Sequence, residues 1–251
     1  MARKELKRKK LEKTLYVHDK PKSIVSEKFR GIRSNIMFSS ANGEIKSVII
    51  TSEKPAAGKS IVSANVAITY AQAGYKTLII DGDMRKPTQH YNFETSNYDG
   101  LSNLIIGKSD FDKAIRSTRV DNLDLLTSGP VPPNPSELIA SERFSKLYKQ
   151  LVDIYDFVII DTPPVIAVTD AQVFLQHVPH CVLVIDAEKN NKTEVKKAKH
   201  LIHKADGHIL GAVLNKTPKD KSSNYYYYGD ESDNDWYTQS HFNRCWWWTK
   251  K

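Results

Sequence analysis

The stretch Thr51-Ser-Glu-Lys-Pro-Ala-Ala-Gly-Lys-Ser60 follows an apolar run typical of a β-strand and opens a pattern typical of a helix. A loop between a strand and a helix N-terminus presents free backbone N–H groups and the positive end of the helix dipole, and Lys59 adds a full charge. The stretch therefore predicts a phosphate-binding loop, in which Ser60 supplies a hydroxyl for a magnesium ion. Glu53 stands where the general motif G-x-x-x-x-G-K-[ST] has its first glycine, so the match is incomplete. The residues expected to bind the phosphates are Lys54, Ala56, Ala57, Gly58, Lys59, Ser60 and Ile61.

The composition indicates a folded protein with one large α/β domain. Of the 251 residues, 40% are hydrophobic and 26% are charged, which is ordinary for a globular chain. No apolar run approaches the roughly 18 residues that a membrane-spanning helix needs, and the two cysteines, Cys181 and Cys245, give no disulfide framework. These features predict a cytoplasmic protein.

The net charge of +8 is concentrated in residues 1–14 and is not spread over the domain. Such a flexible basic arm either contacts anionic lipid or nucleic acid, or is simply solvated. An arm and not a groove carries this charge, and the partners that we expect for the protein as a whole include no nucleic acid. We predict a main domain over residues 15–220 and a tyrosine-rich mobile tail with an extension over residues 221–251.

Six short apolar runs follow the N-terminal region, separated mostly by helix-like stretches. Continuous apolar strands belong in a sheet covered on both faces, so the pattern predicts an α/β fold with a doubly wound, mostly parallel sheet. In such sheets ligands bind beyond the carboxyl ends of the strands, where the loop before Ser60 lies. The predicted strands are residues 47–51, 77–81, 123–127, 157–161, 181–186 and 209–214, and the predicted helices are residues 23–38, 61–72, 135–151, 170–177 and 192–204.

Three aspartates, Asp81, Asp83 and Asp161, end predicted strands or follow them closely. A lone aspartate at a strand end is also a common cap or turn former, but three at one sheet edge favour a site. Magnesium on a nucleotide takes oxygen ligands from one or two carboxylates and the loop hydroxyl, so Asp81, Asp161 and Ser60 are the predicted metal ligands. Asp83 is the predicted base, which accepts the proton of an attacking hydroxyl. Asn215, after the last predicted strand, is a candidate for reading a purine edge.

Two further patterns lie outside the strands. Tyr225, Tyr226, Tyr227 and Tyr228 are consecutive, and because no helix or strand face buries all four, they predict an exposed tail. In the predicted helix 23–38, Glu27, Arg30 and Arg33 share one broad face at spacings of three, for which a solvated surface is the simplest interpretation. The triplet Trp246–Trp248 fits neither a core segment nor a linker, and the sequence assigns it no element.

Together, residues 54–60, 78–87 and 157–164, the Glu27-x-x-Arg-x-x-Arg33 helix and the tyrosine cluster resemble bacterial tyrosine kinases (BY-kinases), in particular the capsular-polysaccharide kinases of Gram-positive cocci. The resemblance covers roughly residues 15–231 and implies a P-loop fold like that of MinD and ParA, with ATP and Mg²⁺ as cofactors. It implies catalytic roles for Asp81, Asp83 and Lys59, and autophosphorylation between subunits at Tyr225 to Tyr228.

The resemblance also implies partners and a cellular role. Family members form ring-like homo-oligomers, which assigns Glu27, Arg30 and Arg33 to subunit contacts. They regulate capsule and exopolysaccharide synthesis, and phosphorylate other proteins of that pathway. A membrane-anchored activator recruits them through its cytoplasmic tail to the inner face of the plasma membrane.

Two departures from the family pattern leave alternatives open. Members have glycine where this chain has Ala56, and alanine there costs about 1–2 kcal/mol if the backbone requires a positive φ. The chain also continues past the acidic residues that follow the tyrosines. One alternative is a switch ATPase of the ParA/MinD type that acts on DNA or membrane, which Lys54 favours because that class has a lysine here. The other is a regulatory subunit of low activity.

Overall fold

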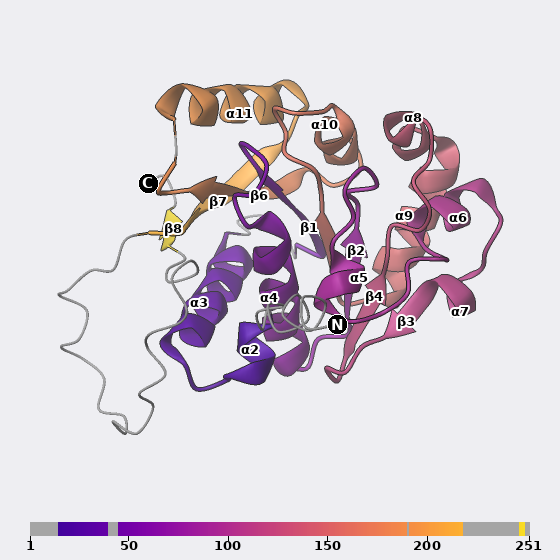
Figure 1. The fold of residues 1–251 in the computed structure, drawn as a ribbon, viewed down its shortest axis with the longest axis horizontal. Helices are drawn as coiled ribbons and strands as arrows, with labels where there is room; N and C mark the ends of the chain where they lie inside the picture. The colour runs from indigo at the N-terminus through magenta and orange to yellow at the C-terminus, as the bar shows by residue number, and fades with distance from the viewer. Residues whose placement is uncertain (1–14, 40–44, 190, 218–245, 249–251) are drawn as a thin grey trace, which may run out of the picture.

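The protein, described here from a computed structural model, is built on an eight-stranded sheet (Figure 1). The structure describes residues 15–39, 45–189, 191–217 and 246–248. The strands are β1 (Ser47–Ser52), β2 (Thr77–Asp81), β3 (Ile115–Ser117), β4 (Leu123–Leu126), β5 (Phe157–Asp161), β6 (His180–Asp186), β7 (His208–Asn215) and β8 (Trp246–Trp248). Their order is β3-β4-β2-β5-β1-β6-β7-β8, in which the six inner strands are parallel and the two edge strands antiparallel.

The six inner strands are those predicted from the apolar runs, and the doubly wound, mostly parallel sheet is confirmed. Two strands were not predicted, β3 and β8, each three residues long. Segments this short have no hydrophobic period of their own, and they become strands because β4 and β7 offer an unpaired edge. The backbone of the tryptophan triplet is thus an edge strand on β7, with Val213 opposite Trp247.

Helices cover both faces of the sheet (Figure 1). The predicted single helix over residues 135–151 is wrong, because the first helix ends at Ile139 and a second begins at Glu142. Ser141 caps this second helix by accepting a hydrogen bond from Phe144 N. Within the described ranges, none of these helices combines the length and the apolar character needed to cross a membrane. The helices are α2 (Tyr16–Asp19), α3 (Ile24–Phe38), α4 (Lys59–Gln72), α5 (Gln89–Asn92), α6 (Leu101–Ile106), α7 (Phe111–Ala114), α8 (Pro135–Ile139), α9 (Glu142–Ile154), α10 (Asp170–Leu175) and α11 (Lys192–Lys204).

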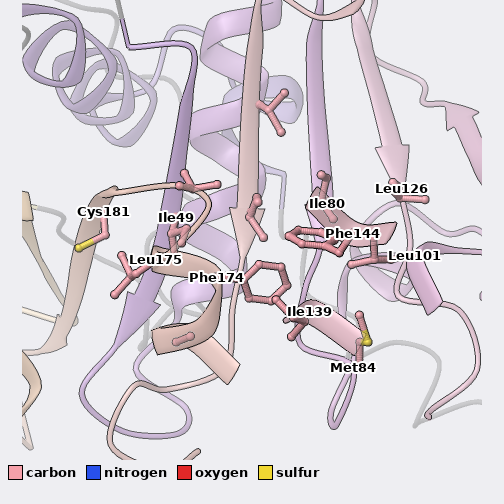
Figure 2. Packing of buried hydrophobic residues seen from close by; sticks show 14 of the residues in the cluster. Ile49, Ile80, Met84, Leu101, Leu126, Ile139, Phe144, Phe174, Leu175 and Cys181 are labelled. Carbon is pink, nitrogen blue, oxygen red and sulfur yellow. The ribbon is translucent and has the colours of Figure 1, made fainter. Parts of the chain in front are cut away.

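Two hydrophobic clusters, one on each face, hold the sheet in place. Alternate residues of β1 enter different clusters: Ile49 packs with α8 to α11, whereas Val48 and Ile50 pack with α2, α3 and α4. In the first cluster Phe144 and Phe174 meet edge to face, with ring centroids 5.4 Å apart (Figure 2). Because β2, β5 and β1 are neighbours in the sheet and run parallel, their carboxyl ends meet at the C-terminal edge of the sheet.

Candidate active site

The predicted phosphate loop connects β1 to α4. The helix begins at Lys59, and Gly58 precedes it in a left-handed conformation with φ of 94°. The backbone N–H groups of the first turn of α4 therefore point toward the space beyond the end of β1, and the helix dipole adds positive potential there. A long, buried helix holds this end in place, since eleven residues of α4 are buried, from Lys59 to Ala71.

The three predicted aspartates lie at the same edge of the sheet. Asp81 and Asp161 are paired in register as the last residues of β2 and β5, and Asp83 follows two positions after Asp81. Gly82 permits this close approach: its N–H donates to Asp161 O at 2.8 Å, and an added Cβ would lie 3.0 Å from that oxygen. All three carboxylates are almost completely buried, with Asp83 5% exposed and the other two 0%.

Lys59 lies at the centre of these acids. Its Nζ is 3.0 Å from Asp83 Oδ2, 3.4 Å from Asp161 Oδ1 and 3.2 Å from Ser60 Oγ. Burial by itself lowers the pKa of Lys59, but the carboxylates of Asp161 and Asp83 outweigh it and the pKa lies above its ordinary value. The ammonium group therefore stays charged and supplies a fixed cation at the start of α4.

The two carboxylate oxygens of Asp81 differ in their hydrogen-bond partners. Oδ2 accepts from the backbone N–H groups of Thr88 and Gln89, both at 2.9 Å, whereas Oδ1 is buried and contacts no donor in the described part of the chain. Burial and the nearby Asp161 carboxylate raise the pKa of Asp81 to about 7, against the two backbone donors and Lys59. A buried acid in this state is one that a cation would stabilise.

The residues at this edge fit a nucleotide-bound magnesium ion. No group of three or more acidic, histidine or cysteine side chains in the described ranges is arranged to hold a metal by itself. Magnesium is ordinarily held by one or two carboxylates, with water and phosphate oxygens completing its octahedron. Asp81 Oδ1, the Asp161 carboxylate and the Ser60 hydroxyl match that limited demand. We call Lys59, Asp81, Asp83 and Asp161 the acidic side of the loop.

A second group of charges lies on the other side of the loop, toward β6 and β7. Glu53, at the position of the motif's first glycine, is buried, and its Oε1 accepts from Asp186 N at 3.1 Å. Burial raises the pKa of Glu53, against the hydrogen bond from Asp186 N. Lys54 reaches in the same direction and donates from Nζ to Lys189 O. The loop entrance is thereby tied to the end of β6.

Ala56 has a φ of 62°, so it lies in the left-handed region that alanine disfavours. Lys216, itself at φ 58°, donates from Nζ to Ala56 O at 2.6 Å and lies 3.1 Å from Asp186 Oδ2. Asn215 donates from Nδ2 to Ala57 O at 2.8 Å. Side chains at the end of β7 thus hold the phosphate loop by donating to the carbonyl oxygens of the loop. We call Glu53, Lys54, Asp186 and Lys216 the clamp side of the loop.

Asn215 lies next to the phosphate loop, as expected for a residue at the end of β7, but it is 2% exposed and one amide N–H is used within the chain. Its contact with a purine stays a prediction.

Opposing effects shift the pKa of Asp186. Burial raises this pKa, whereas the hydrogen bonds from Lys216 and from Lys189 N lower it, and the net shift is downward. Asp186 was missed, although it ends an apolar strand in the same way as Asp81 and Asp161, so the same signal could have found it.

The other predicted residues lie away from this edge. On α3, Arg30 pairs with Glu27 and donates to Pro21 O at 2.7 Å, whereas Arg33 donates from Nη1 to Thr69 O at 2.6 Å on α4. The Glu27 and Arg30 side chains are 49% and 29% exposed, so this face of α3 is partly open to solvent. The arm of residues 1–14 and the cluster Tyr225 to Tyr228 lie outside the described residues.

The sheet, the loop and the acids at its edge define a P-loop nucleotide-binding fold. A protein family described as AAA domain matches residues 45–208. The E. coli tyrosine kinase ETK kinase domain has a TM-score of 0.79 at 36% identity, covering 86% of this chain and 84% of that one. The septum site-determining protein MinD from Pyrococcus horikoshii, determined with Mg-ADP, has a TM-score of 0.59 at 25% identity, covering 70% and 72%.

Proteins of similar sequence identify the family within this class of P-loop proteins. The putative tyrosine-protein kinase CapB of Staphylococcus aureus is 68% identical, covering 90% of this chain and 99% of its own. The tyrosine-protein kinase YwqD of Bacillus subtilis is 40% identical, covering 93% and 98%. Among solved structures, the chimerical protein CapA2B2 has a TM-score of 0.80 at 58% identity, covering 82% of this chain and 91% of that one. The chain belongs to the tyrosine-protein kinase family, which confirms the predicted family and enzyme class.

Proposed function

We propose that this protein uses ATP and Mg²⁺ to phosphorylate tyrosine residues, first of all Tyr225 to Tyr228 of neighbouring copies of the same chain. The observation that carries the proposal is the acidic side of the loop. Three buried carboxylates converge there with one lysine at a helix N-terminus, and Asp81 Oδ1 has no donor within the described ranges. Phosphoryl transfer needs positioning and charge neutralisation more than covalent chemistry, and this arrangement supplies both.

The residues of the acidic side, together with Ser60, divide three tasks in this proposal. Lys59 and the N–H groups at the start of α4 bind the phosphates, and Ser60, Asp81 and Asp161 hold the magnesium ion. When bound, the ion neutralises charge on the β- and γ-phosphates. Asp83, the one acid of the three with measurable exposure, accepts the proton of the tyrosine hydroxyl.

The tyrosine cluster reacts between subunits in this proposal, within a ring-like homo-oligomer. Glu27, Arg30 and Arg33 on α3 make the subunit contacts. The partial exposure of the Glu27 and Arg30 side chains supports this role, whereas the Arg33 guanidinium already donates to Thr69 O within the chain. The activator is a membrane-anchored protein whose cytoplasmic tail recruits the kinase to the inner face of the plasma membrane. The further substrates are proteins of capsule and exopolysaccharide synthesis, as the family resemblance implies.

A phosphotyrosine assay tests the proposal. The full chain is incubated with ATP and Mg²⁺, and phosphotyrosine is quantified by mass spectrometry for the wild type, for Lys59→Met and for Lys146→Met. Lys146 is a control because it lies on α9 with its side chain 79% exposed. We expect phosphate on residues 225–228 in the wild type and the control, and its loss in Lys59→Met. A signal that survives Lys59→Met contradicts the proposal.

The second candidate function is a switch ATPase that acts on DNA or membrane. It rests on the structural similarity to MinD and on Lys54. The same preparation distinguishes the two functions when ATP hydrolysis is measured with duplex DNA or anionic vesicles. Hydrolysis stimulated by either surface, without phosphotyrosine, supports the switch ATPase and contradicts the kinase.

A further inference from the structure

Gln89, the first residue of α5, lies directly behind the acidic side and is completely buried. Its backbone N–H donates to Asp81 Oδ2 at 2.9 Å. Its side-chain Nε2 donates to Asp161 Oδ2 at 2.8 Å and to Ser60 O at 3.0 Å. One residue therefore contacts the three residues that we assign to magnesium, and nothing in the sequence motifs indicated it.

The chemistry of a side-chain amide suits this position. The NH₂ group of Gln89 has two donors, which match the two acceptors on Asp161 and Ser60, and Oε1 accepts from Asn92 Nδ2 at 3.0 Å. A carboxylate at position 89 would place a further negative charge against Asp81 and Asp161. A hydrocarbon would leave the buried Asp161 Oδ2 without this donor.

These bonds decide which oxygens face the phosphate loop. With Oδ2 of both aspartates held by Gln89, Asp81 presents Oδ1, which has no donor among the described residues. Asp161 presents Oδ1 to Lys59 Nζ at 3.4 Å and to Ser63 Oγ at 3.3 Å. The rotation of each carboxylate is thus set before any ligand arrives, which lowers the cost of binding one.

We infer that Gln89 is a positioning residue for the magnesium–nucleotide site: its side-chain amide orients Asp161 and holds the first turn of α4 through Ser60 O. Its backbone N–H, together with that of Thr88, holds Asp81, and this bond does not depend on the side chain at position 89. Gln89 touches neither nucleotide nor metal itself. The inference rests on the proposed function, because it assumes that this edge binds magnesium with a nucleotide. Partners of metal ligands that act in this way typically change metal affinity by about 10- to 100-fold when removed.

The test is the factor by which Mg²⁺ strengthens ADP binding, measured by calorimetry in Mg²⁺ and in EDTA. The variants are Gln89→Leu and Gln89→Glu, and the matched control is Gln150→Leu, an exposed glutamine on α9. We expect both Gln89 variants to lose about 10- to 100-fold of ADP affinity in Mg²⁺ and less than about threefold in EDTA. The control keeps both affinities.

Two results overturn the inference: an unchanged Mg²⁺ factor in the Gln89 variants, or an equal loss in Mg²⁺ and in EDTA, which indicates a merely structural role. If the Gln89 variants fail to fold, Asn92→Ala, which removes the donor to Gln89 Oε1, carries the test. A smaller loss confined to Mg²⁺ then supports the inference, and no such loss contradicts it. A wild type without Mg²⁺-dependent ADP binding contradicts the proposed cofactors instead, so the two failures are distinct.

Discussion

The acidic side and the clamp side of the phosphate loop both pair buried carboxylates with a lysine. The two lysines, Lys59 and Lys216, differ in the other groups that their ammonium groups contact. Lys59 Nζ lies between Asp83 and Asp161, near Asp81, whose Oδ1 contacts no donor in the part of the chain that the structure describes. Lys216 Nζ lies between Asp186 and the backbone carbonyl of Ala56. A lysine among carboxylates can exchange a partner for a phosphate oxygen, whereas a lysine on a loop carbonyl fixes the backbone.

The comparison shows how the loop tolerates its unfavourable residue. Ala56 adopts a positive φ that costs about 1–2 kcal/mol for a residue with a Cβ atom. A hydrogen bond from Lys216 of the clamp side to Ala56 O, and one from the neighbouring Asn215 to Ala57 O, offset this cost. We therefore expect chemistry to depend on the acidic side, and the stability of the loop to depend on the clamp side.

The largest difference is expected between matched aspartate variants, one on each side. Asp83→Asn removes the proposed base and a partner of Lys59, so the initial rate of phosphotyrosine formation falls by about 10²- to 10⁴-fold. Asp186→Asn keeps the shape of the clamp and lowers the same rate less than about tenfold. Equal losses would mean that the two sides do not divide chemistry from loop stability.

The next effect concerns stability and pH in the ligand-free protein. The pKa of Asp81 is about 7 in the folded chain and its ordinary value is 3.8, so the stability from its protonated form is fully present below pH 3.8 and is lost as pH rises through about 7. Asparagine does not titrate. The free energy of unfolding of Asp81→Asn, relative to the wild type, therefore rises between pH 4 and pH 8, on the order of a few kcal/mol at about 1.4 kcal/mol per pKa unit.

Urea unfolding at both pH values measures this change, and Mg²⁺-dependent ADP binding is measured beside it. The variant is expected to gain stability and lose the Mg²⁺ effect, because a functional acid is destabilising until its ligand binds. If the difference in the free energy of unfolding between Asp81→Asn and the wild type stays constant with pH, the pKa of Asp81 is not raised in the folded protein.

A smaller effect is expected from Lys216→Met, which keeps the aliphatic stem but removes the bonds to Ala56 O and Asp186. The loss in the free energy of unfolding is about 1–2 kcal/mol, because a buried carboxylate loses its partner. The exposed control Lys146→Met changes it by less than about 0.5 kcal/mol. Equal losses in the free energy of unfolding for the two variants, measured by urea unfolding, would show that the clamp side does not stabilise the protein.

The smallest effect is a gain. Ala56→Gly removes the Cβ penalty at φ 62° but adds entropy to the unfolded chain, so the free energy of unfolding rises by about 0.5–1 kcal/mol. Thermal unfolding, with Ala57→Gly as the control in the same loop, measures it. A loss of stability in Ala56→Gly would show that the left-handed conformation does not strain the loop.

The sequence by itself determined the six inner strands, the phosphate loop and the three acids at its edge. These features are local: apolar runs, a Gly-Lys-Ser sequence, and aspartates placed where strands end. The helix break near Ala140, the edge strands β3 and β8, and the left-handed Ala56 were decided only by the tertiary structure. So was the role of Gln89, which is far from Asp161 and Ser60 in sequence and meets them because β2 and β5 pair in register. Hydrogen bonds between residues distant in the chain depend on how the strands are ordered, and no local pattern in the sequence carries that order.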